Sequence, residues 1–137
     1  MASYQIFTDA TADCAPQWLA SLPPIEVLPM QVAIEDREYT YGPEGTITVA
    51  DFYARQRAGM YAVTSQITPS QYLQAFEPVL RAGKDILYLC FSSGMSGTFQ
   101  SAQICAEELQ ERYPDRNIIC LDTLCASVGE GFLVCEA

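Results

Sequence analysis

The chain has 137 residues, half of them apolar, and a formal net charge of −10 from 17 acidic and 7 basic residues. This length is typical of one domain with a single core, and a charge of this sign repels phosphate backbones, so we expect no nucleic-acid partner. No apolar run approaches the roughly 18 residues of a membrane span, and the N-terminus lacks the basic region of a signal peptide. We therefore expect a cytoplasmic protein without a transmembrane segment.

Cysteine and histidine usage argues against a metal centre. The chain has six cysteines, no C-x-x-C pair and no histidine. A structural zinc site would need four clustered thiolates, which this spacing does not offer, so we predict no metal ligands. Cys90 and Cys120 lie inside apolar runs that predict core strands, and we expect both to be buried, reduced thiols.

Apolar strands alternate with amphipathic helices along the chain. Helices are predicted to begin at Pro16, after the N-cap Thr48, at Pro69 and near Phe99, and Pro78 is expected to kink or shorten the third. The predicted strands are residues 4–8, 25–29, 30–35, 86–90 and 117–122, with 38–41 as a hairpin partner. This pattern predicts an α/β sandwich with a mostly parallel sheet. A last helix begins near Val128 without a C-cap before Ala137, so we expect the domain to be truncated there.

Three hydroxyl-rich loops follow segments of this pattern. They contain Asp9 and Thr11, then Thr64 and Ser65, and finally the stretch 91–99, which reads Phe-Ser-Ser-Gly-Met-Ser-Gly-Thr-Phe. Backbone N–H groups and hydroxyls at a helix start can bind a small anionic head group such as a carboxylate. The same hydroxyls can equally act as helix caps, and for Asp9 and Thr11 the two interpretations are evenly balanced.

Several catalytic and nucleotide-binding sites are excluded. A Ser–His–Asp centre cannot form without histidine, and Thr98 stands where a nucleophile elbow needs its last glycine. No lysine lies in the 91–99 stretch, as a P-loop requires, and Val134 replaces the third glycine of a dinucleotide fingerprint.

The ordered motifs of the chain resemble those of the DegV family of lipid-binding proteins, which includes the fatty-acid-binding subunits of bacterial fatty acid kinase. The resemblance covers the whole chain, and its most specific motif is residues 92–102. The shorter motifs are residues 8–13, 27–30, 52–53, 64–66 and 121–123. Two positions depart from the family pattern: Ala10 replaces a serine, and Ile67 replaces a proline.

The resemblance implies a three-layer α/β sandwich and a function in lipid binding. Residues 1–137 would form an N-terminal lipid-binding domain, truncated before a C-terminal domain that supplies an arginine and a histidine. The acyl carboxylate would meet Thr64, Ser65, Ser92 and Ser93, with Asp9, Thr11 and Ser96 as secondary candidates. The ligand would be a long-chain fatty acid, with no other cofactor, and the partner would be the catalytic subunit of a fatty acid kinase.

Three functional hypotheses follow. The first is a non-enzymatic fatty-acid-binding protein that presents the acyl carboxylate to the kinase for phosphorylation. The second is a catalytic acyl- or phosphoryl-transfer domain that uses the Ser92, Ser93 and Ser96 hydroxyls, against which the missing general base argues. The third is a structural half-domain whose hydroxyls only cap helices. Without a second domain, an exposed apolar groove is expected to make the chain self-associate.

Overall fold

The centre of the molecule is a four-stranded parallel sheet in the order β2-β1-β6-β7. The structure is a computed structural model that describes residues 3–137. The four strands are β1 (Tyr4–Asp9), β2 (Ile25–Leu28), β6 (Asp85–Cys90) and β7 (Ile118–Asp122). All three pairings are parallel, which confirms the predicted α/β class with a parallel sheet.

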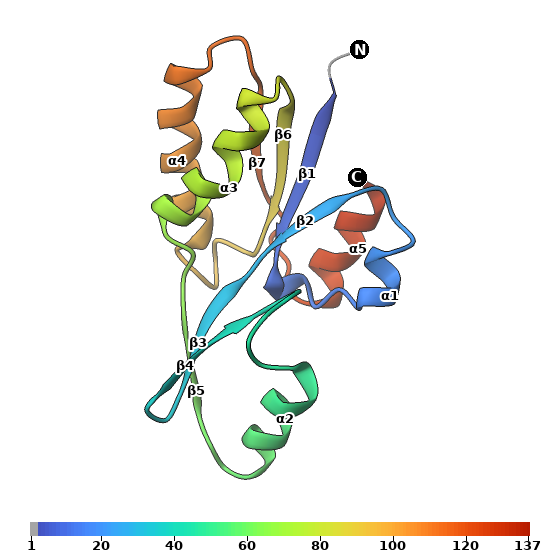
Figure 1. Cartoon of the computed structure of the whole chain (residues 1–137), viewed down its shortest axis with the longest axis vertical. Helices are drawn as coiled ribbons and strands as arrows, with labels where there is room; N and C mark the ends of the chain where they lie inside the picture. Colours follow the sequence, from blue (N-terminus) through green and yellow to red (C-terminus); the bar gives the residue numbers. More distant parts are fainter. Residues whose placement is uncertain (1–2) are drawn as a thin grey trace.

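Two helices cover one face of this sheet, α3 (Pro69–Arg81) and α4 (Thr98–Arg112), as Figure 1 shows. Aromatic rings fill the space beneath them. The centroids of the fully buried Phe7 and Phe76 rings lie 4.9 Å apart in an edge-to-face arrangement, and Tyr88 completes the cluster. Such pairs add about 0.5–1.5 kcal/mol to the free energy gained from area burial alone.

The opposite face carries α1 (Pro16–Leu19) and α5 (Val128–Glu136), which gives three layers (Figure 1). Val134 of α5 packs against Ile6 and Leu89. These two helices do not cover β7, where Ile119 and Leu121 are 56% and 46% exposed. Leu121 pairs in register with Leu89, so these apolar side chains lie on the α5 side of the sheet.

A second, antiparallel sheet stands beside the first, in the order β4-β3-β5. Its strands are β3 (Met30–Ile34), β4 (Arg37–Tyr41) and β5 (Ala62–Ser65). The β3–β4 hairpin was predicted by the alternating apolar pattern and the intervening turn. The short helix α2 (Val49–Arg57) packs on this sheet through Phe52, which joins the cluster of Val32, Ile34 and Ile47.

The start of α3 follows its sequence signals, whereas its end does not. Thr68 and Gln71 form a reciprocal capping box, and Pro69 occupies the first turn. The helix continues through Pro78 to Arg81 instead of ending early. Pro78 is exposed, so water can reach the backbone carbonyl that the proline leaves without its helical partner.

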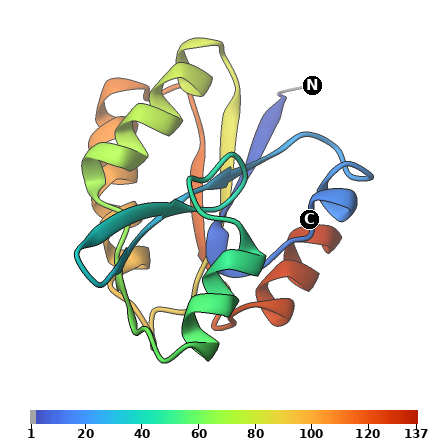
Figure 2. The ribbon, with the colours of Figure 1, turned by 60° about the horizontal axis from the view of Figure 1, so that its bottom comes forward.

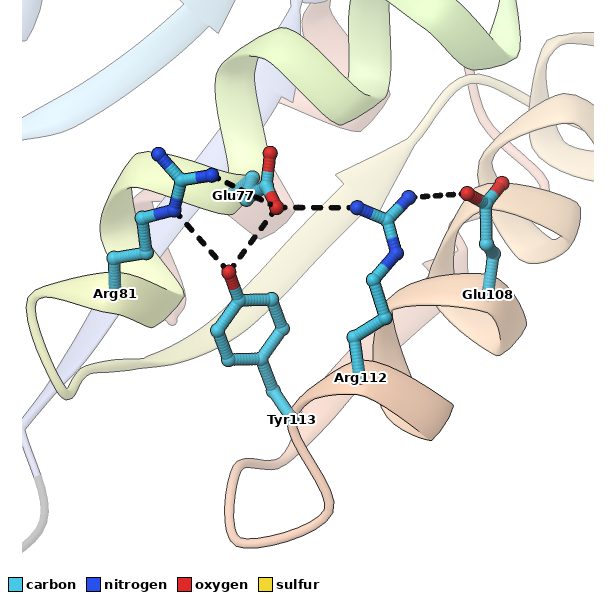
Figure 3. Close-up of polar contacts among 5 residues, drawn as sticks. All are labelled: Glu77, Arg81, Glu108, Arg112 and Tyr113. Atoms are coloured by element: carbon cyan, nitrogen blue, oxygen red, sulfur yellow. Dashed lines mark hydrogen bonds and ion pairs between the residues drawn. The ribbon is translucent and has the colours of Figure 1, made fainter.

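A polar network ties α3 to α4 on the outside of the molecule (Figure 3). Glu77 Oε1 accepts from Arg112 Nη1 and from the Tyr113 hydroxyl, both at 3.1 Å. Arg81 pairs with the same carboxylate, and Arg112 also contacts Glu108. Hydrogen bonds and ion pairs raise the pKa of both arginines, so the network stays charged.

All six cysteines are free thiols. Cys90 is fully buried in β6, as predicted, while Cys120 in β7 is only half-buried because the sheet ends at that strand. Among residues 3–137, no helix has the length and apolar character needed to cross a membrane.

Candidate functional site

The loops that leave β1, β6 and β7 meet at one edge of the parallel sheet (Figure 2). This edge is where α/β folds place ligands, because the carboxyl ends of parallel strands converge there. Backbone hydrogen bonds lock the three loops together: Ser92 N–H donates to Cys125 O at 3.0 Å, and Ser127 N–H donates to Thr11 O at 2.8 Å. The loops therefore form a single surface.

An apolar groove separates this surface from the antiparallel sheet and α2. It consists of two adjoining cavities of about 320 and 660 Å³, which share Ala10, Asp13, Tyr41, Tyr53 and Ser127. The smaller cavity is also lined by Thr11, Met30, Val32, Phe52, Thr64, Phe91, Met95 and Ala126. We call the two cavities together the groove. Its walls suit an elongated apolar ligand with a small polar end.

The two predicted hydroxyls of β5 lie differently. Thr64 is exposed and lines the smaller cavity. Ser65, the next residue of the strand, is exposed but does not line it, since successive side chains alternate across a strand. The following residue, Gln66, lies so close to Gly97 that a Cβ at Gly97 would collide with its Oε1. This contact brings the Thr64 segment to the loop that precedes α4.

Ser92 and Ser93 lie at the start of the loop after β6. Ser92 is buried, and its Oγ accepts from Gly94 N–H at 3.2 Å. Ser93 is exposed, and its N–H donates to Asp122 Oδ1 at 3.1 Å. Burial raises the pKa of Asp122, but hydrogen bonds from Ser93 and Leu124 outweigh it and lower the pKa. Ser93 therefore presents its side chain to solvent beside an ionised carboxylate.

Ser96 serves the start of α4. Its Oγ lies 2.8 Å from Thr98 Oγ1 and accepts from Thr98 N–H at 3.2 Å. These contacts satisfy one of the N–H groups that the first helical turn leaves without a partner.

Asp9 is fully buried and held by four donors. Its Oδ2 accepts from the Tyr88 hydroxyl at 2.9 Å and from Phe91 N–H at 3.2 Å. Its Oδ1 accepts from the N–H and the hydroxyl of Thr11. Burial raises the pKa of Tyr88, and the Asp9 charge raises it further, so the phenol remains a donor. Asp9 thus organises the loops rather than facing the groove.

Two residues that line the groove, and one buried residue that contacts its wall, were not singled out from the sequence. Tyr41 comes from β4, and its hydroxyl donates to Asp13 Oδ1 at 3.2 Å; burial raises its pKa to about 12. Ser127 precedes α5 and lines both cavities. Glu130, in the first turn of α5, is fully buried and contacts Thr11. Its one sequence signal is an acidic residue at the start of a helix whose next five residues, 131–135, are uncharged.

Comparison with known proteins decides the family. A family model described as "Uncharacterised protein, DegV family" matches residues 3–137. The chain belongs to the DegV family. A DegV domain-containing protein of Clostridium perfringens is 39% identical over 134 residues, which are 98% of this chain and 46% of that relative. This DegV chain therefore spans about half the length of such relatives.

Two solved structures share the fold. A DegV family protein from Thermus thermophilus, described with fatty acid binding, is 28% identical with a TM-score of 0.79, over 98% of this chain and 45% of that one. The fatty acid kinase (Fak) B3 protein of Streptococcus pneumoniae, loaded with linoleic acid, is 21% identical with a TM-score of 0.76, over 96% of this chain and 46% of that one. The identity to the second supports only a common fold.

Proposed function

We propose that this DegV chain binds a long-chain fatty acid in the groove and takes part in presenting the acyl carboxylate to a separate kinase. The observation that carries the proposal is the groove itself. Met30, Val32 and Phe52 give it apolar walls, and Thr64 contributes a residue with a hydroxyl group to the lining of its smaller cavity. Burying an acyl tail gains about 0.8 kcal/mol per CH₂, while its carboxylate requires hydrogen-bond donors.

For the head group we infer that Thr64 and Ser93 are the carboxylate donors, with Ser65 and Ser92 close by. Thr64 lines the smaller cavity, and the Gln66–Gly97 contact holds its segment against the Ser93 loop. The ionised Asp122 beside Ser93 repels an incoming carboxylate. A bound head group therefore needs a cation, which the family resemblance assigns to a second domain.

That second domain is part of the proposal. The apolar side chains of Ile119, Leu121 and Phe132 are exposed on the same side of the molecule as α5. Parallel sheets are normally covered on both faces, and relatives are about twice as long as this chain. We propose that the second half of a longer polypeptide covers this face and one side of the ligand.

The contacts of the serine-rich loop favour a binding function over a catalytic one. The Oγ atoms of Ser92 and Ser96 are engaged with backbone N–H groups of their own loop and helix. The chain contains no histidine to activate either hydroxyl. These residues suit a rigid anion-binding loop better than a nucleophile.

Native mass spectrometry of a polypeptide that includes the second half, purified from cells, tests the proposal. The informative variant is Met95→Glu, because Met95 lines the smaller cavity yet is 69% exposed, so a charge there repels a carboxylate without burial. The matched control is Tyr61→Glu at a residue that is 86% exposed and outside the groove. We expect wild type and control to retain a fatty acid and Met95→Glu to lose it. Equal retention by both variants would contradict the proposed location.

A further inference from the structure

Glu130 is a carboxyl group buried where α5 contacts the turn after β1. Its side chain has no exposed surface, although it lies in the first turn of a surface helix. The contact is close: a Cβ on the next residue, Gly131, would lie 2.8 Å from Ala12 O. Glycine at 131 thus lets the helix approach and carries Glu130 into the interior.

The protons around Asp9 can be assigned from geometry. The Tyr88 hydroxyl lies 2.9 Å from Asp9 Oδ2 and 2.8 Å from the Tyr72 hydroxyl. If Tyr88 donates to Asp9, Tyr72 can donate to Tyr88, and every proton has an acceptor. Together with the N–H groups of Thr11 and Phe91, this makes Asp9 an ionised carboxylate.

One hydroxyl then lies between two carboxyl groups. Thr11 Oγ1 contacts Asp9 Oδ1, and it lies 2.8 Å from Glu130 Oε2. A threonine hydroxyl carries a single proton, which goes to the ionised Asp9. The 2.8 Å contact with Glu130 is a hydrogen bond only if Glu130 supplies the other proton. The Thr8 hydroxyl lies 3.2 Å from Glu130 Oε1 and 3.0 Å from Leu89 O, and its single proton goes to one of these two acceptors at a time.

The groups that face Glu130 favour the same assignment. Asp9 and Asp13 are acidic, and burial raises the pKa of the nearby thiols of Cys14 and Cys90, so these thiols stay neutral and no positive charge in this group stabilises an ionised Glu130. Burial and the Asp9 charge raise the pKa of Glu130, and although hydrogen bonds with Thr11 and Thr8 lower it, the pKa is about 8. An acidic group in such surroundings retains its proton at neutral pH.

We propose that Glu130 is held as a neutral carboxylic acid and acts as a latch that fastens α5 to the β1 turn, so that its ionisation in alkaline solution loosens one wall of the groove. Thr11 and Ser127 form that wall, and Ser127 N–H donates to Thr11 O at 2.8 Å. When Glu130 loses its proton, the lone pairs of Glu130 Oε2 and Thr11 Oγ1 face each other without a hydrogen between them. Asp9 and Glu130 are then two buried anions in one cluster. The first turn of α5 relieves both by moving away from the turn.

Infrared difference spectroscopy and hydrogen exchange on the same lipid-free protein test the latch. Between pH 6 and 10, wild type should show a protonated-carboxyl carbonyl band that disappears with a midpoint near 8. Glu130→Gln should lack the band because it has no carboxyl group at this position. Its amide N–H can donate to Thr11 at every pH, so the contact should persist. Glu136→Gln, at an exposed carboxylate of the same helix, should keep it. Amides of residues 127–131 should exchange at least tenfold faster above the midpoint, after correction for intrinsic rates, in wild type but not in Glu130→Gln.

Two results would overturn the proposal. The first is a wild-type spectrum at pH 6 without the band, because Glu130 would then be ionised. The second is unchanged protection of residues 127–131 across the midpoint. Should Glu130→Gln fail to fold, Thr11→Val provides the second variant: it removes the shared hydroxyl and should shift the midpoint of the band, whereas an unshifted midpoint counts against the latch. No lipid is involved, so the outcome is independent of the proposed function.

Discussion

The hydroxyl of Tyr88 lies 2.9 Å from Asp9 Oδ2, which joins the middle of β6 to the end of β1 inside the core. A buried carboxylate is tolerated only when its oxygens are hydrogen-bonded. Tyr88 therefore has two roles, as an aromatic ring in the core and as a donor beneath the loops of the groove.

Tyr88→Phe removes that donor and retains the ring. A hydrogen bond to a charged group contributes about 1.5–3 kcal/mol, and we expect the free energy of unfolding to fall by about this amount. Urea denaturation followed by circular dichroism measures it, with Tyr61→Phe at an exposed position as the control. Equal stability of the two variants would show that Asp9 does not depend on Tyr88.

The stability of the protein should depend on pH through Glu130. Its pKa is raised from 4.5 to about 8 in the folded chain, so the folded state binds the extra proton between these values. The resulting stabilisation is fully present below about pH 4.5 and is lost as pH rises toward 8. The slope for one group is about −1.4 kcal/mol per pH unit at most.

Denaturation of wild type and Glu130→Gln in parallel isolates this dependence, because all other titrating groups are common to both. We expect the wild type to lose stability relative to the variant from pH 5 to pH 8. A constant difference across that range would mean that Glu130 has an ordinary pKa in the folded protein.

Cysteine reactivity should follow burial. Burial raises the pKa of Cys90, and it raises that of Cys120 to about 12, so neither forms the reactive thiolate at neutral pH. Labelling of native protein followed by peptide mass analysis should miss Cys90 and reach Cys120 only slowly, with both labelled after unfolding. Rapid native labelling of Cys90 would contradict its place in β6.

The 137-residue chain should self-associate through the open sheet face. Ile119 and Leu121 are apolar and exposed on the edge strand β7, where another chain can bury them. Sedimentation velocity should show concentration-dependent association that Ile119→Ser reduces, while Val63→Ser, at a residue 68% exposed on the other sheet, does not. Association unaffected by Ile119→Ser would place the contact elsewhere.

The sequence predicts the parallel sheet well because its strands are short apolar runs bounded by turn residues and separated by capped helices. It does not predict β5, which has only four residues, ends in the hydroxyls of Thr64 and Ser65, and has mostly exposed side chains. The pattern also overstates the effect of Pro78, whose lost hydrogen bond falls near the exposed end of α3.

The candidate site can be predicted from the sequence only in part, because some of its residues have local motifs and others depend on long-range contacts. Hydroxyl motifs mark Thr64 and Ser93, because strand ends followed by helix starts have a local signature. The contribution of Glu130 depends on the approach of α5 to a turn 119 residues earlier in the chain at Thr11, and no local pattern encodes that contact.

Calorimetric titration with a long-chain fatty acid tests the central claim most directly. It should be performed on a polypeptide that includes the second half, with Thr64→Ala, Ser93→Ala and the exposed control Ser70→Ala. Loss of a hydrogen bond to a charged head group should weaken binding about tenfold or more in the first two variants and leave the control unchanged. Normal affinity in both Thr64→Ala and Ser93→Ala would contradict the assignment of these hydroxyls to the fatty-acid carboxylate.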